Sequence, residues 1–335
     1  MNDLGSMPVE GRIATRRLGA DASGLAEAAR LLAGGELVAF PTETVYGLGA
    51  DATDPSAVAR IFAAKERPRF NPLIAHLPDA AAARAEGRFD AAASRLAEAF
   101  WPGPLTLVVP AHARTSVCDL ARAGLPSLAL RVPRSALAQD LLARVGRPVA
   151  APSANRSGRV SPTSAAHVLG DLDGRVAAVL DGGATPVGLE STVIACLGGP
   201  PRLLRPGGLP REAIRAVLGT DILDAEADAA ERPVGPGLLA SHYAPRARVR
   251  LDAERIEPGE AALLFGPDTP PGCVEARATF NLSPQGDPAE AAAHLFAALR
   301  DLDASGASVI AVAPVPMSGL GEAINDRLRR AAAPR

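Results

Sequence analysis

The chain has 335 residues, enough for about two ordinary domains, and its 35 Lys and Arg residues nearly balance 37 Asp and Glu residues. The net charge of −2 argues against a protein that coats nucleic acid through overall positive charge, but leaves room for a local basic groove. No stretch approaches the roughly 18 apolar residues of a membrane span, and the N-terminus lacks the apolar segment of a secretory signal. We therefore expect a cytoplasmic protein with no membrane partner.

Helical patterns alternate with short strand-like runs from residue 21 to about 219. Segment 21–35 predicts a helix and segment 36–41 a strand. Further strand-like runs lie at 72–77, 104–110, 127–133, 147–152, 176–183 and 191–197, with helical stretches up to residue 100 and at 135–146 and 163–172. Some strands are too close in sequence for a helical crossover, so we predict an α/β domain with a twisted mixed sheet.

A second helix is expected over 53–68, where Asp54 can cap the start and Pro68 ends the pattern. Lys65 and Arg67 then lie at its C-terminal end. Lys65 is the only lysine of the chain, which otherwise uses Arg. A single lysine in such a sequence suggests a specific role, and chance is the alternative.

Periodicity fades over 220–247, which reads as a linker rich in Asp, Glu, Ala, Pro and Gly. A β-α-β-α pattern follows. We therefore predict a large α/β domain at 1–219 and a small Rossmann-like α/β domain at 248–335. The small domain has no GxGxxG fingerprint, which gives dinucleotide binding little support. Three isolated cysteines, none in a CxxC pair, indicate core residues in a reducing compartment rather than a metal site.

Rare and polar residues gather at element ends. Tyr46, Tyr243 and Trp101 stand among Gly and Pro, where they hint at a site, although filling the core is the alternative for each. Ser153 and Asn155 directly follow a strand, a good position for touching a ligand, although a local Asx or Ser turn is the alternative and is the more common use of such residues.

Two arginines, Arg131 and Arg205, stand in apolar strand-like surroundings. A buried arginine is costly unless an anion meets it, and an internal carboxylate is the alternative to a bound ligand. Together with Lys65 and Arg67 they would form a cationic cavity suited to phosphates or carboxylates. GxxxxGK[ST], HExxH and GxSxG are all absent, so we expect any phosphate chemistry to rest on positioned Lys and Arg side chains and on Mg²⁺.

Eight segments follow one another along the chain: FPTETVYGLGADA, AAKERPRFNPLIAH, FWPGPLTLVV, LALRVP, AAPSANRSG, DGGATPVGLESTV, LLRPG and PGLLASHYAP. In this order they resemble the long, two-domain threonylcarbamoyl-AMP synthases of the YrdC-type family. The resemblance runs from about residue 12 to 246, and GLGEAINDRLRRAA near the end is also similar. In PGLLASHYAP, Leu239 stands where many relatives have a basic residue, so a phosphate contact from that position is not expected.

The resemblance implies an α/β fold around a basic cavity and an enzyme that joins L-threonine, bicarbonate and ATP into threonylcarbamoyladenylate, with release of pyrophosphate. A separate tRNA threonylcarbamoyl-transfer system would use the product, and a weak contact with tRNA itself would be compatible. The linker would reach over the active site.

The resemblance also assigns roles. Lys65 and Arg67 would be catalytic and point at the phosphates. Threonine would be held by Thr44, His76, Arg131, Ala151 and Ser191. ATP would be held by Arg67, Asn71, Ser127, Ser153, Asn155, Arg205 and Tyr243. Two other classes of function stay open, an RNA-binding module and a nucleotide or threonine sensor without turnover.

Overall fold

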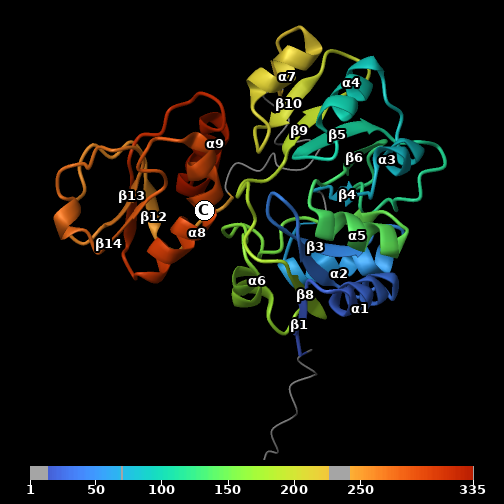
Figure 1. The fold of residues 1–335 in the computed structure, drawn as a ribbon, viewed down its shortest axis with the longest axis horizontal. Helices are drawn as coiled ribbons and strands as arrows, with labels where there is room; N and C mark the ends of the chain where they lie inside the picture. The colour runs from blue at the N-terminus through green and yellow to red at the C-terminus, as the bar shows by residue number, and fades with distance from the viewer. Residues whose placement is uncertain (1–13, 69–70, 226–241, 335) are drawn as a thin grey trace, which may run out of the picture.

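The computed structural model describes residues 14–68, 71–225 and 242–334. This part of the chain forms two β-sheets with separate sets of helices, which lie side by side (Figure 1). We call residues 14–225 the large domain and residues 248–334 the C-terminal domain. No helix among these described residues is long and apolar enough to cross a membrane.

The large domain contains eleven strands and seven helices within its described residues. Its strands are β1 (Arg16–Gly19), β2 (Val38–Pro41), β3 (Tyr46–Asp51), β4 (Ile74–His76), β5 (Leu105–Pro110), β6 (Ser127–Arg131), β7 (Val149–Ala150), β8 (Ala178–Asp181), β9 (Thr192–Ala195), β10 (Arg202–Arg205) and β11 (Leu223–Asp224). Its helices are α1 (Ala22–Ala33), α2 (Pro55–Lys65), α3 (Ala80–Glu86), α4 (Ala91–Phe100), α5 (Ala136–Val145), α6 (Ala165–Leu172) and α7 (Arg211–Leu218).

These strands form one mixed sheet in the order β1-β8-β2-β3-β7-β4-β6-β5-β9-β10-β11. β5 pairs antiparallel with β6 and parallel with β9, so the predicted mixed sheet is confirmed. β3 was not predicted, because its sequence YGLGAD has two glycines and a weak strand pattern. Gly49 is required there, since a Cβ would lie 2.9 Å from the Phe40 ring.

Helix α2 begins as predicted but ends earlier. Asp54 accepts a hydrogen bond from the Ser56 N–H and caps the first turn. The helix stops at Lys65 because Glu66 adopts a left-handed conformation with φ 55°, so the end predicted at Pro68 was wrong. The turn at Glu66 therefore separates Lys65, which is still helical, from Arg67, which is not.

The C-terminal domain has a four-stranded parallel sheet in the order β12-β15-β13-β14. Its elements are β12 (Arg248–Arg250), β13 (Ala261–Leu264), the 3₁₀ helix η1 (Cys273–Glu275), β14 (Ala278–Asn281), α8 (Pro288–Ala304), β15 (Val309–Val312) and α9 (Gly321–Ala332). The two predicted strands and two predicted helices all form, but β12 and β14 were not predicted, so the observed order is β-β-β-α-β-α. The domain boundaries stay predictions, since residues 226–241 of the predicted linker lie outside the described residues.

The two domains share a core. Val45, Val160 and Leu189 of the large domain pack in one apolar cluster with the interior of the C-terminal domain. Gly188 marks the closest approach, because a Cβ there would lie 2.3 Å from the carbonyl of Ala292 on α8. Helices α8 and α9 thus lie on the side of the C-terminal domain that faces the large domain (Figure 1).

Candidate active site

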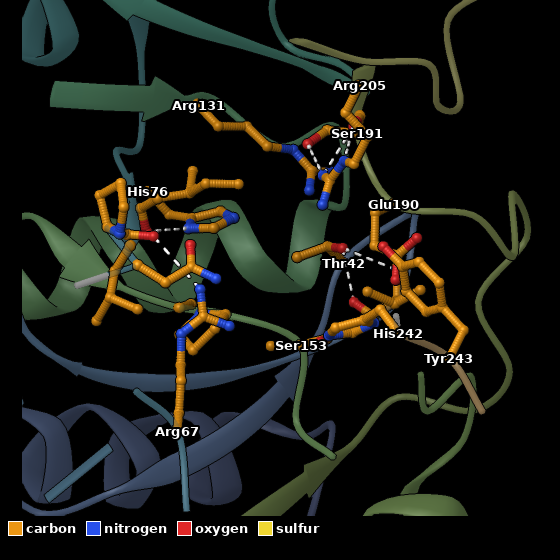
Figure 2. Close-up of a pocket in the computed structure, with 18 of the residues that line it drawn as sticks. Thr42, Arg67, His76, Arg131, Ser153, Glu190, Ser191, Arg205, His242 and Tyr243 are labelled. Atoms are coloured by element: carbon orange, nitrogen blue, oxygen red, sulfur yellow. Dashed lines mark hydrogen bonds between the residues drawn. The ribbon is translucent and has the colours of Figure 1, made fainter. Parts of the chain in front are cut away.

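A cavity opens between the large sheet, residues 242–243 and helix α9. Figure 2 shows Arg67 and His76 on one side of it and Glu190, His242 and Tyr243 on the other. Its lining residues are Thr42, Val45, Gly47, Arg67, Asn71, Pro72, Leu73, Ile74, His76, Arg131, Ala151, Pro152, Ser153, Glu190, Ser191, Arg205, His242, Tyr243 and Arg330. Most come from strand ends, where side chains at one edge of a sheet can converge.

Glycine at position 47 keeps the floor of this cavity open. Gly47 lies on β3 and forms a bridge to Ser153, so the segment after β7 runs directly across it. A Cβ on Gly47 would lie 3.1 Å from the Cβ of Ala151. The small side chains at 47 and 151 therefore let two backbone segments meet and leave space above them.

Arg131, at the end of β6, lines the cavity and is only 3% exposed. Its Nη2 lies 2.8 Å from Oε1 of Glu43, a buried ion pair. The contact lacks the alignment of a hydrogen bond, since neither atom has a hydrogen-bond partner in the described residues. An internal carboxylate therefore does meet Arg131, and the guanidinium also lines the cavity, so its predicted role in binding a ligand stays a prediction.

Arg67 is the cation of the opposite wall. The one hydrogen bond of its side chain within the described residues is a long one, from Nη2 to the Pro72 carbonyl at 3.5 Å, and its Nε is buried without a partner. Burial lowers the pKa of Arg67 to about 10. No carboxylate within the described residues forms an ion pair with it, so a bound anion would satisfy it best.

Arg205, at the end of β10, is buried and also pairs with neutral groups. Its Nη2 donates to the carbonyl of Ser191 at 2.8 Å, and its Nε donates to the same oxygen at 3.2 Å. Burial lowers its pKa. Ser191 is fixed in turn by a 2.7 Å hydrogen bond to the hydroxyl of Thr106. Arg205 and Ser191 therefore form one rigid wall.

Lys65 does not belong to the described lining of the cavity, unlike Arg67, Arg131 and Arg205. Its side chain is 1% exposed and donates to the carbonyls of Ser153, at 2.6 Å, and Asn155. Burial, with the charge of Arg67, holds its pKa well below the usual range. Three of the four cations expected in the cavity, Arg67, Arg131 and Arg205, therefore line it. Lys65 instead holds the segment that carries Ser153.

The remaining predicted residues divide into two groups. His76, Ala151, Ser153, Ser191, Asn71 and Tyr243 line the cavity with the three arginines. Thr44, Ser127 and Asn155 are buried but are not among the described lining residues. Thr44 bonds the hydroxyl of Thr42 within the turn after β2. The Asn155 amide donates to the carbonyls of Arg156 and Arg159, so it shapes a turn.

Tyr243 combines a contact to the cavity with packing between domains. Its ring stacks on Phe296 of α8 at 5.5 Å, and its backbone adopts a left-handed φ of 64°. Burial raises the pKa of its hydroxyl. Of the other rare aromatic residues, Tyr46 donates to the Gly183 carbonyl and Trp101 to the Leu105 carbonyl, and both belong to the core.

Sequence reasoning missed Thr42, Glu190, His242 and Arg330 as lining residues. Glu190 and His242 adjoin predicted residues, Ser191 and Tyr243, and adjacency was the available signal. Arg330 comes from α9, far along the chain, and its backbone carbonyl accepts a hydrogen bond from the N–H of His242 at 3.3 Å. Only the docking of the C-terminal domain brings it to the cavity.

Three titratable groups of the cavity hold fixed charge states near neutral pH. Burial and the neighbouring Arg131 lower the pKa of His76 to about 3. Burial, with the charges of Arg67 and Lys65, lowers the pKa of His242 to about 3 although Glu190 opposes it. Burial alone would raise the pKa of Glu190, but Arg327 and Arg205 outweigh it and hold the value at about 2. The histidines are therefore neutral and Glu190 is ionised.

Comparison with known proteins identifies the family. Residues 30–207 match the Sua5/YciO/YrdC family model, described as "Telomere recombination", and residues 209–333 match the model "Threonylcarbamoyl-AMP synthase, C-terminal domain". The chain belongs to the threonylcarbamoyl-AMP synthase family. The threonylcarbamoyl-AMP synthase of Bacillus subtilis is 41% identical over 321 residues, which cover 92% of each chain. That of Pyrococcus abyssi is 42% identical and covers 91% of this chain and 92% of the relative.

A solved structure of this family agrees over both domains. Pyrococcus abyssi Sua5 complexed with L-threonine superposes with a TM-score of 0.84 at 38% identity, covering 95% of this chain and 97% of that one. Escherichia coli YciO matches over 58% of this chain at 22% identity and a TM-score of 0.52, which shows the shared fold of the large domain. The long family members thus share both domains with this chain.

Proposed function

We propose that this protein synthesises L-threonylcarbamoyladenylate from L-threonine, bicarbonate and ATP, and releases pyrophosphate. The observation that carries the proposal is the convergence of Arg67, Arg131 and Arg205 on one cavity in a chain of this family. Its relatives bear the name of this activity, and one was crystallised with L-threonine. The product would pass to a tRNA threonylcarbamoyl-transfer system in the cytoplasm.

The threonine subsite would lie at Arg131. A guanidinium can bind a carboxylate through two parallel hydrogen bonds, and Glu43 holds this one in place from behind. His76 and Ala151 complete the surface, and the neutral ring of His76 adds no competing charge. Ser191 offers a hydroxyl near the side chain of the substrate.

The ATP subsite would lie at Arg67 and Arg205. Both are cations without a carboxylate ion pair in the described residues, and a triphosphate would supply the missing negative charge. Asn71, Ser153 and Tyr243 surround this region. Lys65 supports it by anchoring the segment of Ser153, and we keep Ser127 and Asn155 as proposed supporting residues.

The reaction needs two bond exchanges. The amine of threonine attacks the carbon of bicarbonate, the C–N bond forms and water leaves, which gives a carbamate. A carbamate oxygen then attacks the α-phosphorus of ATP, and the bond to the β-phosphate oxygen breaks. Since Glu190 is locked to Arg327 and the histidines are weak bases, catalysis would rest on positioning and on charge stabilisation.

Mg²⁺ would fit this site only as a companion of the phosphates. The described residues contain no cluster of three or more His, Cys, Asp or Glu side chains that could hold a metal. Mg²⁺ commonly binds through substrate phosphates, water and few protein ligands. A cavity without a cluster of protein ligands is therefore compatible with Mg²⁺ that arrives with ATP. When bound, it would neutralise phosphate charge, while the arginines orient the nucleotide.

A single assay tests the function. Purified protein receives ATP, Mg²⁺, labelled bicarbonate and threonine, and a labelled adenylate and pyrophosphate are measured. Omission of bicarbonate, or replacement of threonine by serine, should reduce both products. ATP or threonine binding without pyrophosphate would favour a sensor instead, and salt-dependent tRNA binding without turnover would favour an RNA-binding module.

A further inference from the structure

Arg327 lies on α9 of the C-terminal domain, and its side chain is fully buried against the large domain. Its Nε donates to Oε2 of Glu190 at 2.8 Å, and its Nη1 donates to the carbonyl of Pro206 at 2.9 Å. The same Nη1 lies 2.5 Å from the carboxylate of Asp326. One guanidinium from the C-terminal domain therefore holds two separate segments of the large domain.

Both segments carry residues of the cavity. Glu190 directly precedes Ser191, and Pro206 directly follows Arg205. The side chain of Arg205 itself donates to the carbonyl of Ser191. Arg327 thus fixes, from outside the cavity, the two backbone segments whose contact forms the Arg205 wall. A guanidinium suits this task because its planar fork donates in several directions at once.

Tyr243 is the second cavity residue, after Glu190, that Arg327 contacts. The guanidinium carbon lies 5.1 Å from the centroid of the Tyr243 ring, a cation–π distance. Phe296 of α8 stacks on the same ring. Tyr243 keeps a left-handed backbone without being glycine, so contacts around it must hold that conformation.

We propose that Arg327 is a positioning residue for the nucleotide part of the site, and that the C-terminal domain is thereby part of the catalytic apparatus. This inference rests on the proposed function. Within the described part of the chain, Arg327 forms no hydrogen bond or ion pair with Arg131, Glu43 or His76. Its loss should therefore affect ATP far more than threonine.

The test compares four variants. Arg327→Met removes the cation, Arg327→Lys keeps a cation without the fork, and the double variant E190Q/R327M leaves no uncompensated carboxylate. Arg329→Met is the matched control, because Arg329 lies on the exposed side of the same helix. KM for ATP, KM for threonine, kcat and Tm are measured, and calorimetry gives Kd for the non-hydrolysable analogue AMPCPP.

For R327M we expect the Kd for AMPCPP and the KM for ATP to rise by about 10- to 100-fold, with KM for threonine changed less than about threefold. R327K should fall between R327M and the wild type, and R329M should match the wild type. E190Q/R327M should show the same loss of AMPCPP binding as R327M while folding more stably. If R327M does not fold, the double variant and R327K carry the test.

Equal effects on ATP and threonine, or unchanged AMPCPP affinity in the folded variants, would overturn the positioning role. A wild-type protein that binds AMPCPP but forms no labelled adenylate would overturn the proposed function alone. The AMPCPP affinities of the variants would then still test the role of Arg327. A wild type that does not bind AMPCPP at all would overturn both.

Discussion

Two buried ion pairs beside the cavity have opposite orientations. In the pair Arg131–Glu43 the guanidinium lines the cavity and the carboxylate lies behind it. In the pair Arg327–Glu190 the carboxylate lines the cavity and the guanidinium lies behind it. The first pair is contained in the large domain, whereas the second joins the two domains.

The comparison shows which charges are left for substrate. Both pairs are internally compensated, so they add shape and orientation rather than net charge. Arg67 and Arg205 differ from them, because the hydrogen bonds that their side chains form within the described residues go to neutral oxygens. The net positive charge of the cavity thus lies where we propose that the phosphates bind.

Substitution of Arg131 should give the largest effect on stability. Arg131→Met leaves Glu43 buried without its cation, and we expect a loss of about 3–5 kcal/mol in the free energy of unfolding. The double variant E43Q/R131M should lose clearly less, because no charge stays uncompensated. Chemical denaturation of both variants measures this. Equal losses would show that the pair is not the cause.

Substitution of Arg67 should affect turnover rather than folding. For Arg67→Ala we expect a fall in kcat of at least about 10²–10³-fold, the usual effect of losing one charge-stabilising donor. Stability should change little, since no carboxylate loses a partner. Arg60→Ala is the matched control, an exposed arginine on the preceding helix. Near-normal turnover of R67A would refute its role.

Lys65 should have a smaller effect that acts through the segment of Ser153. Lys65→Met removes the donor to the Ser153 and Asn155 carbonyls, and we expect turnover to fall by about 10- to 100-fold. Lys65→Arg should also lose activity, because a planar fork is larger than the ammonium that fits between these carbonyls. Steady-state rates measure the activity of both variants. Full activity of K65R would show that position 65 does not require lysine.

His76 should make stability depend on pH. The pKa of His76 is about 3 in the folded protein, against an ordinary value of 6.5. Between these two pH values His76 binds a proton in the unfolded chain but not in the folded protein. Stability should therefore fall as pH drops from 6.5 towards 3, by about 2 kcal/mol at pH 5 from this group. His76→Gln should lose that share of the pH dependence. An identical pH profile for both proteins would contradict a neutral, buried His76.

Local patterns were sufficient to predict the α/β class, most of the elements and three of the four cations. Arg67, Arg131 and Arg205 lie at the ends of a helix or of strands. The hydrophobic periodicity of these elements, and the Gly and Pro residues that bound them, are visible in the sequence. The separation of Lys65 from Arg67 was not visible, because the left-handed turn at Glu66 lies between them. That conformation belongs to a non-glycine residue, which carries no sequence signal for it.

The partners of the charged residues could not be predicted for a different reason. Glu43 lies in the turn between β2 and β3 whereas Arg131 ends β6, and Glu190 meets Arg327 across 137 positions of sequence. Such pairs depend on how whole domains pack, which periodicity does not encode. Glycines 47 and 188 were visible, but the close contacts that require small residues there appear only in three dimensions.

A crystal structure of the protein with AMPCPP, Mg²⁺ and L-threonine would test the division of charge most directly. We predict phosphate oxygens within hydrogen-bonding distance of Arg67 and Arg205, and the threonine carboxylate on Arg131 with Glu43 still behind it. Phosphates bound away from both Arg67 and Arg205, or threonine bound away from Arg131, would contradict it.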